Sequence, residues 1–378
     1  MDWKIRSSLS ESLEFADNRR LEINPRGSSY NSVSSLMFDA QALTPTSSAV
    51  LIGNLKYLTF AGPAETETRD AFNQDVTVTL GKKEKSTSYN FSASYRRSEI
   101  TTVQLEETGF ATLRGSVIVT IVGGGLKHEL GPIDTIAWST NYSSTDFTLQ
   151  NGTPSAILTS TLDWTHRVSP IIAVTPSLQY QLLTYGDASQ TEVMFWKAMM
   201  GMNTELTKRL SFQAAAGGTL LSSEQNNVMS GPIPIAQTSG SNLGWLANAQ
   251  LTYRPFKTVK VFVTAARTVA PTILGEFVNS DSLSLALNYD INQVSSLSLS
   301  GSITQQTAAK GGASVPGGLS ATGGSSEFLT AAIAYSRQLA REWRTNLSYR
   351  HVHRNSDIGV ARSNSIVLVM TRDATIVP

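Results

Sequence analysis

Cysteine is absent from this 378-residue chain, and charged residues are scarce. Without cysteine the chain forms no disulfide, no thiolate metal site and no cysteine nucleophile. Only 16% of the residues are Asp, Glu, Lys or Arg, against about 25% in typical soluble domains. The formal net charge is +1 and no basic run is long, so the electrostatic signature of a nucleic-acid-binding protein is missing.

Long apolar segments are missing as well. No stretch reaches the roughly 18 apolar residues that a membrane-spanning helix requires. The first residues, MDWKIRSSLS, contain no apolar core of a signal peptide. If the protein is exported, we therefore expect the chain to be the mature form with an added Met1.

The chain is rich instead in segments where polar and apolar residues alternate. In Ser295–Thr304, Leu297 and Leu299 share one face of a strand and serines occupy the other, because successive strand side chains point to opposite faces. Similar segments recur from end to end, and we count about eighteen of them. One such strand fits either a soluble β-sandwich or a membrane barrel.

The predicted connections between these strands alternate in length. The short ones are Thr44–Ser48, Arg167–Pro170, Thr207–Arg209, Arg254–Thr258, Asp290–Ser295 and Leu339–Glu342. The long ones are Asn18–Tyr30, Ala61–Ala71, Arg97–Gly109, Leu221–Leu243, Gln306–Glu327 and Arg354–Arg362. Short turns on one side and long loops on the other are typical of an outer-membrane barrel.

Two glycine-rich stretches do not fit a phosphate-binding loop. Neither Gly123–Gly125 nor Pro316–Gly318 is followed by a Lys-Ser/Thr pair that opens a helix. We interpret both as flexible loops. The run Gly123–Pro132 is then longer than a short periplasmic turn should be.

Aromatic residues fall near the predicted strand ends. Trp245 and Tyr253 share a face eight positions apart, which at about 3.3 Å per residue and a tilt near 40° separates them by roughly 20 Å along a barrel axis. That distance is close to the height of a lipid-facing band. The alternative, core aromatics of several soluble sandwiches, lacks any linker to divide the domains.

We therefore predict an all-β protein in which residues 1–378 form a single domain. This domain is a transmembrane, antiparallel, up-and-down β-barrel of about eighteen strands, with short periplasmic turns and long extracellular loops. Its place is the bacterial outer membrane, whose lipids surround it.

No constellation of residues points to catalysis, a metal or a cofactor. His351 and His353 share a strand face, but no third metal ligand is near them in sequence, and we interpret them as a solvated rim. Asp163 and His166 fall on opposite faces, so they cannot form a local acid–base pair. Serine is so abundant that any histidine can be paired with one by eye. We expect no enzyme activity, no catalytic residue, no metal site and no cofactor.

The predicted lumen is neutral and hydrophilic. The residues expected to line the translocation path are Lys4, Arg6, Asn90, Asn141, Gln179, Gln181, Asn248, Gln250, Lys260, Ser298, Ser300, Arg344, Asn346 and Arg350. An ion-selective pore is expected to concentrate charge at a constriction, whereas hydroxyl and amide groups can exchange hydrogen bonds with a sliding sugar chain. The alternative is that Ser and Thr are simply convenient polar lumen residues. About eighteen strands leave room for an aqueous channel.

Three stretches resemble a known family. They are WKIRSSLSESLEFADNRRL, YSRQLAREWRTNLSYRHVHR and SNSIVLVMTRD, and they resemble a family of proteobacterial outer-membrane β-barrels of exopolysaccharide and capsule export systems. The matching positions are Phe15, Asp17, Asn18 and Leu21, then Tyr335, Arg337, Trp343, Tyr349 and Arg350, then Ser363, Asn364, Ile366, Leu368 and Met370. The chain departs from the usual barrel ending, because its last strand runs into DATIVP instead of stopping at an aromatic residue.

The resemblance implies a passive conduit for a nascent polysaccharide, working with periplasmic and inner-membrane partners. Our first hypothesis is therefore exopolysaccharide translocation, with Leu221–Leu243 and Gln306–Glu327 gating the outer mouth. The second is a general or sugar-selective diffusion porin, which a narrowed lumen would favour. The third is a barrel hydrolase, or a structural scaffold whose loops bind a partner.

Overall fold

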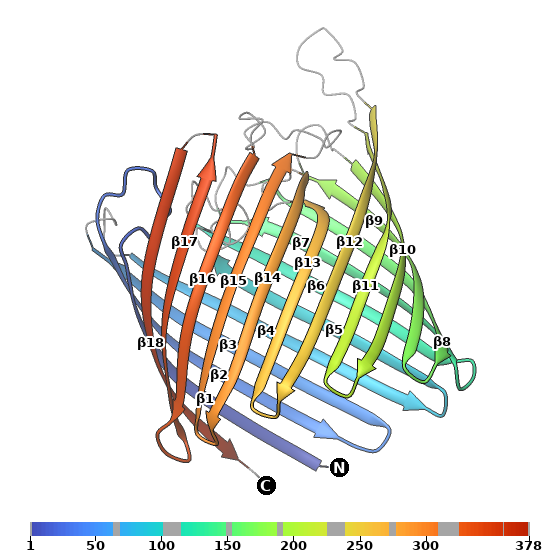
Figure 1. Cartoon of the computed structure of the whole chain (residues 1–378), viewed down its shortest axis with the longest axis horizontal. Coiled ribbons are helices and arrows are strands. Elements are labelled where there is room, and N and C mark those ends of the chain that lie inside the picture. The colour runs from blue at the N-terminus through green and yellow to red at the C-terminus, as the bar shows by residue number, and fades with distance from the viewer. Residues whose placement is uncertain are drawn as a thin grey trace.

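The computed structural model describes residues 2–62, 69–100, 115–148, 153–186, 192–224, 239–271, 277–308, 325–357 and 359–376. In this part of the chain eighteen β-strands form one sheet (Figure 1). The strands are β1 (Asp2–Ala16), β2 (Ser29–Leu43), β3 (Ser47–Ala61), β4 (Arg69–Glu84), β5 (Thr87–Glu99), β6 (Ser116–Glu129), β7 (Asp134–Phe147), β8 (Ser155–Ser169), β9 (Ile172–Tyr185), β10 (Glu192–Thr207), β11 (Leu210–Glu224), β12 (Ser239–Phe256), β13 (Val259–Pro271), β14 (Phe277–Asn292), β15 (Ser295–Ala308), β16 (Ser325–Gln338), β17 (Trp343–Ser356) and β18 (Gly359–Ile376). Within the same residues, no helix is long and apolar enough to cross a membrane.

The sheet closes into a barrel. Each strand pairs antiparallel with its neighbours in sequence, and β1 also pairs with β18, from Ile5 opposite Ile376 to Ala16 opposite Ser365. Closure satisfies the ladder groups of both edge strands, which a membrane requires of any spanning sheet. The predicted fold class, a closed antiparallel barrel with sequential connectivity, is confirmed.

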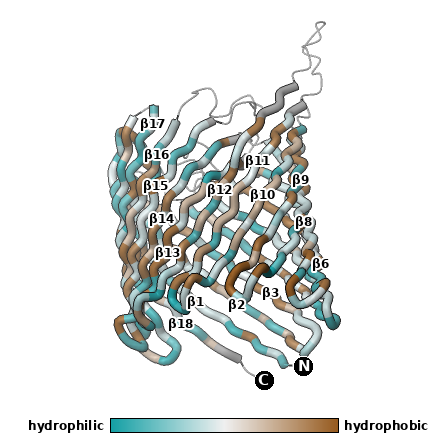
Figure 2. The backbone as a smooth tube through the Cα atoms, turned by 45° about the vertical axis from the view of Figure 1, so that its right-hand side comes forward, coloured by the Kyte–Doolittle hydropathy of each residue, from teal (hydrophilic) through white to brown (hydrophobic). Residues whose placement is uncertain are grey.

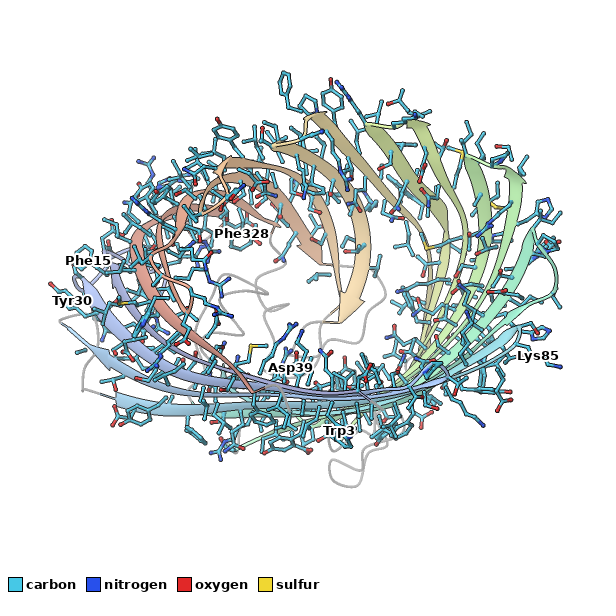
Figure 3. All side chains as sticks on the ribbon, turned by 90° about the horizontal axis from the view of Figure 1, so that it is seen from below. Trp3, Phe15, Tyr30, Asp39, Lys85 and Phe328 are labelled. Atoms are coloured by element: carbon cyan, nitrogen blue, oxygen red, sulfur yellow. The ribbon has the colours of Figure 1, made fainter. Side chains whose placement is uncertain are left out.

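The wall has two faces of opposite character. Figure 3 shows Trp3, Phe15 and Tyr30 pointing away from the barrel, and Asp39 and Phe328 pointing into the lumen. Directly opposed residues of an antiparallel pair share a face, so the registers extend this assignment around the barrel. Figure 2 shows hydrophobic and hydrophilic residues alternating along strands on the side of the barrel that faces the viewer.

The outer face carries leucine and aromatic side chains that the chain itself leaves uncovered. Leu9 is 60% exposed, Trp245 57% and Leu299 42%. On β15 the serines at alternate positions face the lumen instead. The period-two pattern of Ser295–Thr304 therefore separates a lipid-facing row from a water-facing row.

Both ends of the chain lie at the end of the barrel where the connections are short (Figure 1). We name this the turn end, and the opposite end the loop end; in outer-membrane barrels the short turns are periplasmic. The connections 44–46, 170–171, 208–209, 257–258, 293–294 and 339–342 lie at the turn end. Two predicted gating loops fall mostly on 225–238 and 309–324, outside the described residues.

Two predicted loops are wrong. Strand β6 continues through Gly123–Gly125 to Glu129, so the turn is only 130–133. A Cβ on Gly123 would overlap the carboxamide oxygen of Asn141, and that close approach explains glycine in a strand. The predicted long loop Arg354–Arg362 is a tight connection, since β17 ends at Ser356 and β18 begins at Gly359 with φ 136°.

The seam between β1 and β18 is held at the loop end by polar side chains. Both oxygens of Asp17 accept hydrogen bonds from Asn364, one from its backbone N–H (2.7 Å) and one from its side-chain Nδ2 (2.6 Å). Asn18 Nδ2 donates to the carbonyl oxygen of Arg362 (2.9 Å), and the Tyr349 hydroxyl donates to Asn364 Oδ1 (2.8 Å). The sequence motifs at the two ends of the chain thus meet and close the barrel.

Candidate functional site: the barrel lumen

The structure places the side chain of each predicted path residue on the lumen face. They come from β1 (Lys4, Arg6), β5 (Asn90), β7 (Asn141), β9 (Gln179, Gln181), β12 (Asn248, Gln250), β13 (Lys260), β15 (Ser298, Ser300) and β17 (Arg344, Asn346, Arg350). The alternation of β1 and the sheet registers bring all of them to one surface.

Hydroxyl and amide groups cover much of this surface. On β14, β15 and β16, Ser284 lies opposite Ser302, which in turn lies opposite Thr330. Across the lumen wall at β8 and β9, Gln181 Nε2 donates to the Thr159 hydroxyl oxygen at 3.3 Å. Such groups can donate and accept hydrogen bonds and carry no charge, so this wall can replace part of a solute's hydration shell.

Basic side chains stand midway along the lumen. Lys56 on β3 and Arg350 on β17 are exposed to the lumen, and Lys197 on β10 is half-buried with its Nζ 4.7 Å from the centre of the Phe195 ring. Within the described residues, none of the three makes an ion pair with a carboxylate. Each is therefore a base that a solute in the lumen can meet with no carboxylate of the described chain beside it.

Several lumen carboxylates, in contrast, are engaged by neighbours. Arg96 lies 3.2 Å from Asp75, and Arg344 lies 3.2 Å from Asp373. Glu14 accepts a hydrogen bond from Asn31 Nδ2 at 3.2 Å. Each of the two ion pairs is locally neutral, whereas Glu14 keeps its negative charge and Asp163 of β8 also faces the lumen.

Lys56 and Lys197 are not among the residues that the sequence predicted to line the translocation path. Both lie on the lumen face of strands whose other lumen residues are mostly apolar, such as Ile52 and Val193. The signal in the sequence was a single lysine at a position that faces the lumen, on a strand whose other lumen-facing residues are mostly apolar. An alternation test that scores hydrophobicity overlooks such a position.

Near the loop end the lumen wall is apolar and covered. Buried side chains of β9–β12 that face the lumen form a cluster, and Val269 at the end of β13 packs against them; the lumen-facing members are Leu183, Tyr185, Val193, Phe195, Leu221 and Leu246. On the other wall Phe60 is 1% exposed. Lumen-facing residues that are buried this deeply are covered by other protein atoms. The open passage at this level is therefore narrower than the interior of the barrel. The expected hydrophilic lining does not extend to this level, because alternation does not reveal what covers a face.

The histidines do not assemble a catalytic or metal site. His351 and His353 lie on the outer face, where His351 Nδ1 is 2.8 Å from Asn364 Oδ1 and Arg362 Nε donates to His353 Nδ1 at 3.2 Å. His166 pairs with Asp134 on the outer face at 2.8 Å, away from the lumen residue Asp163. Across the part of the chain that is described, no group of three or more His, Cys, Asp or Glu could hold a metal.

Comparison with known proteins finds similarity of fold. No family model matches the chain, and no curated protein does. OccK2 (OpdF) of Pseudomonas aeruginosa superposes with a TM-score of 0.54 at 10% identity, over 100% of this chain and 99% of that one. Pseudomonas aeruginosa OpdK, solved with vanillate, gives 0.51 at 9% identity, over 98% and 99%.

A larger transporter shares the fold as well. The copper transporter OprC gives a TM-score of 0.51 at 11% identity over 92% of this chain but 61% of its own, so this chain spans about three fifths of that transporter. OccK2 has also been solved with glucuronate, with a TM-score of 0.50 at 9% identity over 100% and 99%.

These similarities show the fold and agree with the two-faced wall. The matched structures are outer-membrane porins and a transporter rather than enzymes, in line with the expectation that the chain is not an enzyme. They do not extend to polysaccharide export, so the resemblance at the chain ends is supported only at the level of an outer-membrane barrel. The chain is an integral β-barrel protein of the outer membrane.

Proposed function

We propose that this protein is a diffusion porin that passes small polar solutes, with a preference for anions. The observation that carries the proposal is the set of lumen bases Lys56, Lys197 and Arg350, which have no carboxylate partner among the described residues. Low-dielectric walls concentrate the field of such charges in a water-filled passage. Anions then reach a higher concentration in the lumen than cations of the same size.

The neutral part of the wall supports passage rather than tight binding. Conduction requires sites that bind the solute strongly enough for it to enter the passage and weakly enough for it to leave again. Hydroxyl and amide rows such as Ser284, Ser302 and Thr330 offer many weak hydrogen bonds in succession. We propose that the path residues named from the sequence act in this way, as part of one barrel domain formed by residues 1–378.

The covered apolar wall near the loop end favours small solutes over a polymer. Phe195 is 2% exposed and Phe60 1% exposed although both belong to the lumen side. A passage narrowed in this way suits a porin better than an exopolysaccharide conduit. The complexes of fold neighbours with vanillate and glucuronate support small organic acids as the first solutes to test.

Liposome swelling tests the proposal. Liposomes carrying the purified protein should admit glucuronate faster than glucose, and a triple variant Lys56→Gln, Lys197→Gln and Arg350→Gln should lose most of this difference, several-fold in rate. Lys82→Gln is the matched control, because Lys82 lies on the outer face at the turn end. Equal entry of both solutes into wild-type liposomes would contradict the anion preference.

Neutral sugars are the second candidate class. The uncharged hydroxyl tract on β14–β16 favours them. In the same assay a sugar-selective porin would admit glucose faster than glucuronate and would be indifferent to the triple variant. If long oligosaccharides entered the liposomes as fast as glucose does, this result would instead support the exopolysaccharide hypothesis.

A further inference from the structure

The turn end of the barrel carries basic side chains that solute passage does not use. Figure 3 views the barrel from this end and places Lys85 at its outer edge. The exposed bases there that make no ion pair among the described residues are Lys83, Lys85, Lys127, Arg167, Lys208, Arg209, Arg254, Lys257, Arg337 and Arg341. The carboxylates at this end that make no ion pair are fewer, namely Asp2, Glu129, Glu205 and Asp290. This rim of the barrel is therefore positively charged.

Two adjacent turns bring four of these bases together. Lys208 and Arg209 form the turn between β10 and β11, and Arg254 and Lys257 stand at the turn between β12 and β13. Arg209 Nη1 donates a hydrogen bond to the carbonyl oxygen of Pro255 at 3.0 Å, and the backbone N–H of Arg254 donates to the carbonyl oxygen of Arg209 at 2.8 Å. These bonds hold the two turns side by side. We name the four bases the basic turn pair.

The carboxylates near the basic turn pair do not neutralise it. Glu205 lies near the end of β10, and the backbone N–H of Asp290 donates to the carbonyl oxygen of Thr258 at 2.8 Å. Both carboxylates belong to the lumen face, because Glu205 lies opposite Ser211 and Asp290 lies opposite Ser296. Within the described residues, neither makes an ion pair with any of the four bases. The net charge of this patch is positive even when both carboxylates are counted, so an anionic ligand complements it.

Exposed aromatic side chains place these bases at the surface of the membrane. Phe256 is 69% exposed. It lies opposite Val259, which lies opposite Tyr289, so its ring is on the outer face. Tyr253, which directly precedes Arg254, is exposed on the same face. Aromatic side chains on the outer face near strand ends mark the boundary between membrane and water, so the basic turn pair lies at the depth of the lipid headgroups.

We propose that the basic turn pair binds the headgroups of acidic phospholipids in the membrane leaflet at the turn end. The ammonium groups of Lys208 and Lys257 and the guanidinium of Arg254 donate hydrogen bonds to the phosphate oxygens. Arg209 keeps the two turns together through Pro255. The ring of Phe256 packs against the upper part of the acyl chains. Each base near an acidic membrane surface adds to the attraction.

The combination of bases with an outward aromatic ring selects a lipid over a soluble acidic protein. A protein that docks from the aqueous side meets the charges of the turns but not Phe256, which lies on the outer face. A phospholipid presents a phosphate and acyl chains within one molecule, so it contacts both. The net positive charge of the patch then favours a lipid with net negative charge over a zwitterionic one.

Native mass spectrometry of the whole protein in neutral detergent tests the proposal. The probes are phosphatidylglycerol, phosphatidylcholine with the same acyl chains, inorganic phosphate and poly-glutamate. We expect phosphatidylglycerol to bind roughly fivefold or more tightly than each of the others, the effect of one base near an acidic surface. The triple variant Lys208→Gln, Arg254→Gln and Lys257→Gln should lose most of this preference. The matched control is the lumen variant Lys56→Gln, Lys197→Gln and Arg350→Gln, which removes as many bases from a surface that lipid does not reach.

Two further measurements separate charge from apolar contact. Phe256→Ser should weaken the binding of both phospholipids alike. In the wild type, the preference for phosphatidylglycerol should shrink as added salt shortens the Debye length from about 10 Å at 0.1 M to about 3 Å at 1 M. Retention of the β-sheet circular dichroism spectrum establishes that each variant folds.

Three results would each overturn the proposal. They are equal binding of the two phospholipids by the wild type, unchanged phosphatidylglycerol binding in the triple turn variant, and tighter binding of poly-glutamate than of phosphatidylglycerol, which would indicate an acidic protein partner. The triple turn variant should still admit glucuronate faster than glucose, so failure of lipid binding and failure of the proposed porin function are distinguishable.

Discussion

At the scale of single residues, the side chain of Asn141 on β7 lies close against Gly123 of β6. A Cβ at Gly123 would overlap the Asn141 carboxamide oxygen, which ends an exposed side chain that can turn away, so the cost lies at the low end of the overpacking range, about 1 kcal/mol. Gly123→Ala should lower resistance to urea unfolding in micelles by this amount, and adding Asn141→Ala should restore most of it. Gly131→Ala is the control, because nothing lies within 4 Å of its added methyl group. Equal effects at both glycines would contradict the packing argument.

Asp17 provides a second test at the residue scale. Its two hydrogen bonds to Asn364 tie the first strand to the last, and a lost hydrogen bond with a charged partner is worth about 1.5–3 kcal/mol. Asp17→Ala should therefore lower the unfolding midpoint in urea, while Asp2→Ala, at the exposed start of β1, should have little effect. A midpoint unchanged by Asp17→Ala would show that the seam does not depend on this contact.

At the scale of elements, neighbouring residues of β15 should respond in opposite ways to charge. Leu299 faces lipid and Ser300 faces the lumen. An arginine on the lipid face destabilises a barrel by roughly 2–4 kcal/mol near the midplane, so Leu299→Arg should reduce folding into liposomes. Ser300→Arg should fold normally and change ion selectivity instead. Normal folding of Leu299→Arg with impaired folding of Ser300→Arg would reverse the assigned faces.

The strands were predictable from sequence because their signal is local. Alternation within Ser295–Thr304 needs no knowledge of the neighbouring strands. The errors arose where one strand depends on another: glycine suits position 123 of β6 because the Asn141 side chain of β7 lies against it, and the local sequence does not reveal that contact. Likewise Phe195 is at a lumen position, but its burial depends on chain distant in sequence. The finding that Lys56 has no carboxylate partner among the described residues likewise depends on the folded wall.

At the scale of the whole molecule, an apolar outer face surrounds a lumen in which Lys56, Lys197 and Arg350 have no carboxylate partner among the described residues, and the proposed preference for anions depends on this arrangement. Lys56, Lys197 and Arg350 come from β3, β10 and β17, so three separated parts of the wall contribute to it. The measurement that tests this account most directly is the reversal potential of the purified protein in a planar bilayer under a KCl gradient. The account predicts selectivity for chloride that weakens in the triple Lys56→Gln, Lys197→Gln and Arg350→Gln variant, whereas selectivity for potassium in the wild type would contradict it.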